Sequence, residues 1–233
     1  MDKKEIIKQI AQLSKDFHNT QHKIITEHPD ITASNDARIT VFTNCYIVLD
    51  GIYVCLVVRS YEICEPDWWS KMAQENKVAG TYSIEALSEF LDGFNTFTLS
   101  ACLSLLSGVI ESAFRAFHKA VFPSLKVPFT FECVYKNLLP TLGLSDYLEL
   151  LKLLRLLRNA LAHNNGFHTS NDNCASWEDV SVGFRNGQKV DLGESSGWKV
   201  IIVIASGILD LLKKVVNSNQ IIWQPVINDP SYD

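Results

Sequence analysis

The chain has 233 residues, of which 47% are hydrophobic and 20% are charged. This is ordinary globular usage, so the composition excludes a disordered chain and is sufficient for one hydrophobic core. A net charge of −5 excludes a general electrostatic attraction for nucleic acid, and any contact with RNA must therefore be local.

The first part of the chain predicts two helices. Apolar residues recur at three-four spacing over residues 4–25, which is typical of an amphipathic helix. Asn35 or Asp36 can cap a second helix that runs to about Arg59. Because the apolar surface of this second helix is nearly continuous, we expect it to be a central helix, buried on several sides.

The same second helix has the length of a membrane span, over Ile39–Val58. Asn44 and Asp50 interrupt it, and a carboxylate inside a membrane is costly, so we interpret the segment as a core helix. Residues 1–11 are charged and show no apolar region of a secretory signal. We expect a soluble, cytoplasmic protein that does not contact a membrane.

The middle of the chain begins with an irregular stretch, residues 62–82, which predicts a short helix and loops. It contains Trp68 and Trp69, which can stack nucleic-acid bases but more often anchor a loop on the core. A long helical pattern then runs from Ser83 to about Val121, before Pro123 stops it.

Two further helices follow. One is predicted over Phe131–Leu142, and the next has Ser145 as its capping residue and Tyr147–His163 as its body. Leucines at three-four spacing form the core stripe of the second of these helices. Asn164-Asn165-Gly166 supplies its C-terminal break.

The last third of the chain starts with polar residues and a short alternating run, Val180–Phe184. Asn186-Gly187 follows this run and is a strong two-residue turn signal, so we expect a small β-hairpin insertion near residues 180–192. Trp198–Val216 predicts a final helix, and the tail from about residue 217 should be loosely attached. The expected fold is an all-α bundle of about five to seven helices with this hairpin, forming one domain over residues 1–233.

Six cysteines are widely spread, and none forms a CxxC pair or lies at metal-ligand spacing from a histidine. We expect them to be reduced and mostly buried, with Cys102 and Cys133 acting as small hydrophobic residues. The chain also lacks a glycine-rich phosphate loop, a GxSxG elbow and an HExxH motif. We therefore expect neither a metal ion nor a cofactor.

One compact polar constellation remains, at residues 158–163. Asn159 and His163 share a helix face, whereas Arg158 lies about 140° from His163 on an ideal helix. A site that uses both Arg158 and His163 requires the last turn to distort, or a second copy of the helix across a two-fold axis. In the alternative interpretation, Arg158 is a surface cation and His163 caps the helix.

Lys152 and Arg155 extend this constellation into a small basic cluster. It is sufficient for a local phosphate site, although such clusters are often only a solvated helix face. His168, in the polar stretch that follows, can add a polar contact, but a loop histidine of this kind is more often solvated.

Residues 156–166, Leu-Leu-Arg-Asn-Ala-Leu-Ala-His-Asn-Asn-Gly, resemble the Rx4H signature of HEPN-domain proteins. That signature has an arginine, a polar residue that is often asparagine, three further residues and a histidine, and Arg158, Asn159 and His163 match these positions. The resemblance implies a helical bundle that dimerises. It also implies a metal-independent ribonuclease of the kind found in toxin–antitoxin, phage-defence and RNA-processing systems.

The resemblance further implies roles for individual residues. His163 would act as general base or acid, and Arg158 would bind phosphate oxygens. Asn159 would orient the histidine or the phosphate. Glu111, on the preceding long helix, would hold Arg158 or tune His163, although Glu111 and Arg115 are also spaced as an ordinary i,i+4 ion pair.

The expected partners are RNA, a second copy of the chain and an antitoxin or regulatory protein. An alternative function is a catalytically inactive HEPN-like module that dimerises, binds a nucleotide or binds a protein partner. The accessibility of Arg158 and His163 in a cleft discriminates between these interpretations.

Overall fold

The structure is a computed structural model that describes residues 2–31, 34–60, 84–163, 167–168, 171–190 and 194–229. For residues 84–87, 162–163 and 194–196 it describes the backbone alone. The expected short helix and the two tryptophans of the 62–82 stretch lie outside the described residues.

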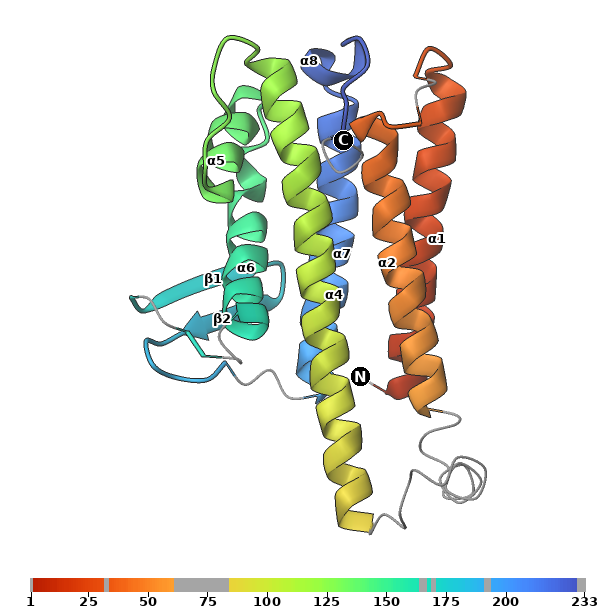
Figure 1. Cartoon of the computed structure of the whole chain (residues 1–233), viewed down its shortest axis with the longest axis vertical. Coiled ribbons are helices and arrows are strands. Elements are labelled where there is room, and N and C mark those ends of the chain that lie inside the picture. The colour runs from red at the N-terminus through yellow and green to blue at the C-terminus, as the bar shows by residue number, and fades with distance from the viewer. Residues whose placement is uncertain are drawn as a thin grey trace.

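Four long helices form an elongated bundle (Figure 1). They are α1 (Lys3–Glu27), α2 (Ala37–Val58), α4 (Ile84–Val121) and α7 (Glu194–Val216). Helix α1 packs against α2 and α7, and α4 packs against the same two helices from the other side. The predicted all-α bundle is therefore confirmed.

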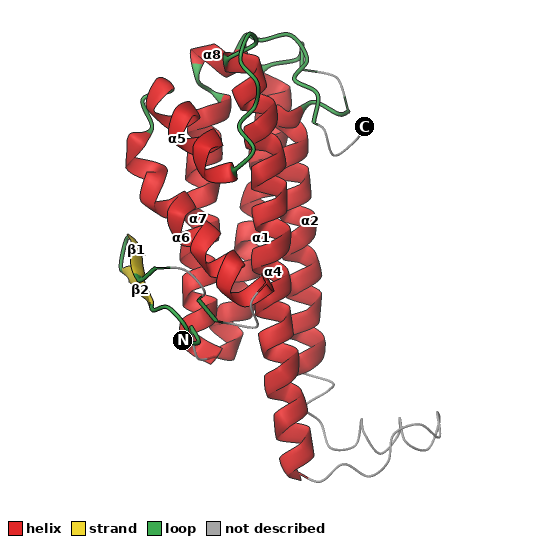
Figure 2. Cartoon of the chain, turned by 60° about the vertical axis from the view of Figure 1, so that its left-hand side comes forward, coloured by secondary structure: helices red, strands yellow, loops and turns green. Residues whose placement is uncertain are grey.

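Shorter helices pack beside α4, on the side away from α1 and α2 (Figure 1). They are α5 (Phe131–Thr141), the 3₁₀ turn η2 (Ser145–Tyr147), α6 (Leu148–Arg158) and the π-helical turn η3 (Asn159–His163). A last short helix, α8 (Asn219–Ile222), caps the upper end of the bundle. Figure 2 shows how strongly helix dominates the chain.

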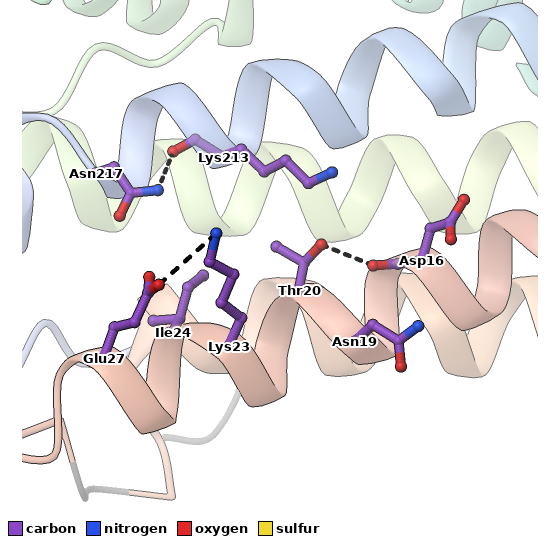
Figure 3. Close-up of a pocket in the computed structure, with 8 residues that line it drawn as sticks. All are labelled: Asp16, Asn19, Thr20, Lys23, Ile24, Glu27, Lys213 and Asn217. Carbon is purple, nitrogen blue, oxygen red and sulfur yellow. Dashed lines mark hydrogen bonds and ion pairs between the residues drawn. The ribbon is translucent and has the colours of Figure 1, made fainter.

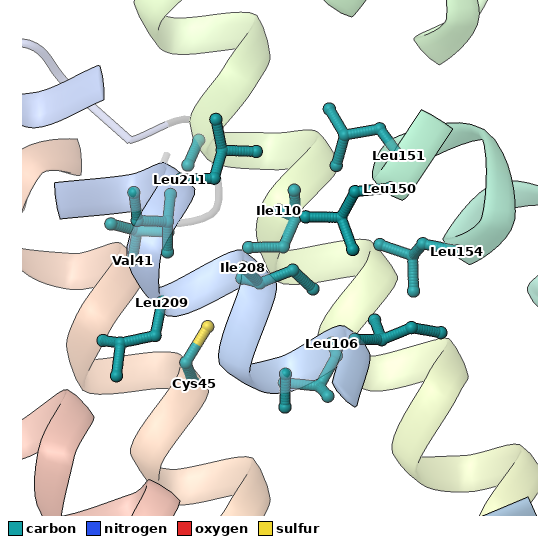
Figure 4. Packing of buried hydrophobic residues seen from close by; sticks show 14 of the residues in the cluster. Val41, Cys45, Leu106, Ile110, Leu150, Leu151, Leu154, Ile208, Leu209 and Leu211 are labelled. Carbon is teal, nitrogen blue, oxygen red and sulfur yellow. The ribbon is translucent and has the colours of Figure 1, made fainter. Parts of the chain in front are cut away.

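The core lies where α2, α4, α6 and α7 meet, and Figure 4 shows part of it. Helices α6 and α7 contribute the stripes of apolar residues that their sequence periods predict, whereas the apolar residues of α2 follow no such stripe. Fully buried examples are Val41 and Cys45 of α2, Leu106 and Ile110 of α4, Leu150 and Leu154 of α6, and Ile208 and Leu211 of α7. Cys45 and Cys102 are buried free thiols, as expected, whereas Cys133 and Cys174 are exposed.

The expectation that the second helix is central is wrong. Helix α4 is the central one, because it alone packs against α2, α5, α6, α7 and α8. Helix α2 buries one side, and Ile47 and Val54 on its other side are each 55% exposed. The sequence pattern failed here because apolar residues continue around the helix onto a side where Ile47 and Val54 remain exposed.

Helices α2 and α4 pack side by side and both carry exposed apolar residues, Ile47 and Val54 on α2 and Phe97 and Leu105 on α4; these four residues are named the α2–α4 face. Phe97 is 69% exposed and Leu105 is 54% exposed. Thr40 of α2 and Ser112 of α4 both bind Asp229, which sets the antiparallel register of the two helices. Two turns further on, Ile47 therefore lies level with Leu105.

Two described segments, Ala37–Val58 and Ser88–Val121, are long and apolar enough to cross a membrane by length and composition. Core helices of soluble proteins pass the same test, and 33% and 50% of the respective windows are buried within the fold.

The hairpin consists of β1 (Asn173–Trp177) and β2 (Val180–Phe184), paired antiparallel with Trp177 opposite Val180. The predicted hairpin and its strand 180–184 are confirmed, but the partner strand precedes it instead of following it. Glu178-Asp179 makes the turn, with Glu178 at a φ of 50°. Asn186-Gly187 makes a separate turn, in which the amide of Gly187 donates to the carbonyl of His168.

The expected loose tail is instead firmly held. The buried guanidinium of Arg38 donates to Asp36 and to the carbonyls of Ile222 and Gln224. The carboxylate of Asp229, which is 2% exposed, accepts hydrogen bonds from Thr40 and Ser112. Residues 217–229 therefore complete the upper end of the bundle, because buried polar groups on α2 and α4 require these partners.

Candidate functional site

The end of α6 departs from α-helical geometry where the polar constellation begins. Helix α6 ends at Arg158, and Asn159–His163 form a π-helical turn. A π-turn links residues five apart, whereas an α-helix links residues four apart. The helix that carries Arg158 and His163 is therefore distorted at its last turn, as a site that uses both residues requires.

Glu111 of α4 lies against this turn. Its Oε2 is 3.9 Å from Nη1 of Arg158, and its Oε1 is 2.6 Å from Nη2 of Arg115. Nε of Arg115 also donates to Oε1, at 3.1 Å. The i,i+4 pair of Glu111 and Arg115 is thus the tighter contact, and the same carboxylate also faces Arg158.

The three side chains of this ion-pair group are partly accessible. Their exposed fractions are 23% for Glu111, 27% for Arg115 and 31% for Arg158. They are neither sealed in the core nor fully solvated, so the Arg158 guanidinium, which Glu111 faces, stays accessible from solvent.

Arg115 also organises the chain that follows α4. Its Nη1 donates to the carbonyl of Pro128 and its Nη2 to the carbonyl of Phe129, both at 2.8 Å. The loop that descends beside the end of α4 to the start of α5 is thereby fixed to the same ion-pair group (Figure 1). The sequence indicates Arg115 only as the partner of a helix ion pair, and no local signal in it points to Phe129.

The other predicted cations are paired with carboxylates. Arg155 lies 3.2 Å from Glu132 of α5, and Lys152 lies 3.3 Å from Glu149 one turn earlier. Glu132 also accepts from Lys136, and this bond together with the charge of Arg155 lowers its pKa. Arg155 therefore ties α6 to α5, Lys152 pairs within α6, and Arg158 is the cation nearest the π-helical turn.

Asn159 is half-buried and begins the π-helical turn. The backbone of His163 ends that turn, and its side chain is among those not described. The four predicted site residues thus lie on two packed segments, since Glu111 comes from α4 and Arg158, Asn159 and His163 come from the end of α6.

His168 is not the solvated loop residue that the sequence suggests. It is 3% exposed, its ring packs on Phe184, and its Nε2 lies 2.9 Å from the carbonyl oxygen of Asn171. This histidine holds the chain before the hairpin, because a buried imidazole needs a polar partner and finds one in the backbone.

A separate groove of about 330 Å³ lies between α1 and the end of α7 (Figure 3). Its lining residues include Thr20, Lys23, Lys213 and Asn217, and no residue of α6 or η3 is among them. Several of its polar groups bind within their own helix, as Thr20 does to the carbonyl of Asp16. The groove is therefore distinct from the site around Arg158.

Within the described ranges, no three His, Cys, Asp or Glu side chains gather as metal ligands would. Comparison of the chain with models of protein families, with curated proteins and with solved structures finds no match. The function must therefore be argued from the geometry of the site itself.

Proposed function

We propose that the protein is a metal-independent endoribonuclease of the HEPN type, with Arg158, Asn159, His163 and Glu111 as its site. The observation that carries this proposal is the π-helical turn Asn159–His163, which relates Arg158 and His163 at the five-residue spacing of their motif. π-turns of this kind occur frequently at functional sites. The contact between Glu111 and Arg158 supports the same assignment.

The chemistry requires no metal. A ribose 2′-hydroxyl attacks the adjacent phosphorus, the bond to the 5′-oxygen breaks, and the products end in a 2′,3′-cyclic phosphate and a 5′-hydroxyl. His163 moves the protons, since an imidazole with an ordinary pKa near 6.5 can accept or donate one at neutral pH. Arg158 neutralises the charge that grows on the phosphate oxygens.

Glu111 and Asn159 have positioning roles in this proposal. The carboxylate of Glu111 limits the directions that the Arg158 guanidinium can take, because it faces Nη1 from the neighbouring helix. Asn159 orients the histidine or the phosphate. The proposed substrate is single-stranded RNA, and the net charge of −5 means that affinity must come from the site itself.

The proposed assembly is a cytoplasmic homodimer in which two copies of the motif meet. The α2–α4 face supports this assembly, because it presents exposed apolar side chains that a second copy can cover. Glu111 and Leu105 belong to the same helix but lie about 120° apart around it, so the α2–α4 face supports the association of two copies and does not by itself bring the two Arg158 side chains together. A role in phage defence or in a toxin–antitoxin pair, with an antitoxin or regulatory partner, follows from the resemblance.

The decisive experiment is cleavage of mixed cellular RNA in EDTA by the wild type, His163→Ala and Arg158→Ala, with analysis of the new ends. We expect cleavage by the wild type, 2′,3′-cyclic phosphate ends, and loss of activity in both variants. Arg155→Ala is the matched control, because Arg155 lies on the same helix and is paired with Glu132. It should retain activity.

A second measurement tests the assembly. Leu105→Glu should convert a dimer into a monomer in sedimentation analysis, whereas Leu125→Glu, at a similarly exposed leucine outside the α2–α4 face, should not. Folded, dimeric protein whose His163→Ala variant behaves like the wild type toward RNA would overturn the ribonuclease proposal. It would favour the inactive helical module, for which the exposed α2–α4 face is an interaction surface.

A further inference from the structure

The loop between α4 and α5 carries the most exposed large hydrophobic side chain in the described part of the chain. Phe129 is 96% exposed, whereas the next aromatic residue, Phe131, is 7% exposed and packs edge-on against Phe114. Burying an aromatic side chain is favourable, so a fully exposed ring is a candidate contact residue when other features beside it point to a ligand.

Loose attachment of the loop does not explain this exposure. Arg115 donates two hydrogen bonds to the loop, to the carbonyls of Pro128 and Phe129, both at 2.8 Å. Pro128 restricts the backbone immediately before Phe129, and Thr130 caps helix α5 immediately after it. The phenyl ring is therefore presented to solvent from a backbone that is fixed on both sides.

The backbone of Phe129 is linked through two side chains to the proposed phosphate-binding residue. Phe129 is bound through its carbonyl to Arg115, Arg115 pairs with Glu111, and Glu111 faces Arg158. One continuous chain of contacts thus connects the exposed ring with Arg158. An RNA whose phosphate lies on Arg158 has its neighbouring bases within reach of this loop.

The charge around the loop favours a polyanion over a protein partner. Residues 112–131 contain no Asp or Glu, and the flanking Glu111 and Glu132 are each paired with basic side chains. The segment contains Arg115, Lys119 and Lys126, and both lysines are exposed. Cations beside an exposed aromatic ring are the usual combination in sites for single-stranded nucleic acid, where bases stack on the ring and phosphates lie on the cations.

We propose that Phe129 is a base-stacking residue that holds a nucleobase of single-stranded RNA beside Arg158. This inference rests on the proposed function, because it names how the same site grips its substrate. Phe129 takes no part in the bond changes. It fixes the strand so that the phosphate next to the stacked base meets Arg158, and it discriminates single-stranded from paired RNA, whose bases are already stacked.

The test is the binding of a short fluorescent 2′-O-methyl oligonucleotide, which cannot be cleaved because its attacking hydroxyl is blocked. We expect Phe129→Ala to weaken binding by about 5- to 150-fold, which is the effect of losing one stacked base. Phe129→Trp should preserve binding, and Phe129→Leu should resemble Phe129→Ala. Leu125→Ala is the matched control, because Leu125 is a 59% exposed apolar residue of the same loop without a π-face.

Salt dependence separates stacking from charge. Arg158→Ala should reduce the slope of log affinity against log salt by about 0.7, and Phe129→Ala should leave that slope unchanged. An oligomer of the same length without bases should bind the wild type and Phe129→Ala equally.

The possible failures are distinguishable. Equal binding of the base-containing oligonucleotide by the wild type and Phe129→Ala would overturn the stacking role and leave the proposed function intact. It would instead make Phe129 a candidate contact for a protein partner. A wild type that binds no oligonucleotide would overturn the proposed function and the stacking role together.

Discussion

Replacing Glu111 by Gln removes the carboxylate charge between Arg115 and Arg158 and keeps the size of the side chain. The two ion pairs have side chains that are 23% to 31% exposed, and pairs at such exposure contribute about 0.2–1 kcal/mol each. The free energy of unfolding should therefore fall by about 2 kcal/mol at most. RNA cleavage should fall by about 100-fold, because a guanidinium that is misplaced by about 1 Å loses most of its effect on the reacting phosphate.

Urea unfolding and initial rates on a fluorescent single-stranded RNA measure the two effects separately. Glu149→Gln is the control, since Glu149 forms a comparable surface pair with Lys152 on α6. It should change neither quantity by much. Glu111→Gln with wild-type cleavage, beside an inactive Arg158→Ala, would refute the positioning role and leave Glu111 as a helix ion pair.

Three further predictions concern the fold that supports the site. Arg38→Ala breaks a buried ion pair and should lower the free energy of unfolding by about 3–5 kcal/mol, with faster proteolysis of the C-terminal tail. A rate and pattern of proteolysis equal to those of the wild type would contradict this prediction. Gly207→Ala puts a Cβ 2.6 Å from Nε1 of Trp177 and should lower the free energy of unfolding by about 1–3 kcal/mol in thermal melts. The Cβ of Gly108→Ala meets no atom within 4 Å, and this variant should raise the free energy of unfolding by up to about 1 kcal/mol in the same melts. Burial lowers the pKa of His118 below 6.5, so the folded state holds the imidazole neutral and the unfolded state binds the proton first. The free energy of unfolding should therefore fall as pH drops from 6.5 to the folded-state pKa, by at most about 1.4 kcal/mol per pH unit. A His118→Phe variant with the same dependence of stability on pH would refute this assignment.

Much of the fold could be predicted because helix formation leaves local signals. Asp36 caps α2 and α4 ends before Pro123, as the local sequence indicates. The predicted cap Ser145 instead begins the 3₁₀ turn η2, and no side chain caps α6. The three-four spacing of apolar residues likewise fixed which face of α1 and α6 is buried.

Contacts between distant residues could not be predicted in this way. The tail is anchored because Asp229 meets Thr40 and Ser112, and no local pattern pairs these positions. The pairing of residues 173–177 with strand 180–184 was not predicted, because a Glu178-Asp179 turn gives a weaker sequence signal than Asn186-Gly187. Helix α2 has one uncovered face because α4 occupies the centre.

Some features of the candidate site follow from the local sequence, and others follow only from the packing of distant segments. The sequence by itself determined the motif, the order Arg158, Asn159 and His163, and the helix that carries it, since these are properties of one short segment. Only the tertiary structure decided that this segment ends in a π-turn, that Glu111 faces Arg158, and that Arg115 fixes Phe129 beside them. The physical reason is that hydrogen bonds and ion pairs between segments depend on how α4 packs against α6, and hydrophobic spacing specifies the buried faces but not which polar side chains meet at their edges.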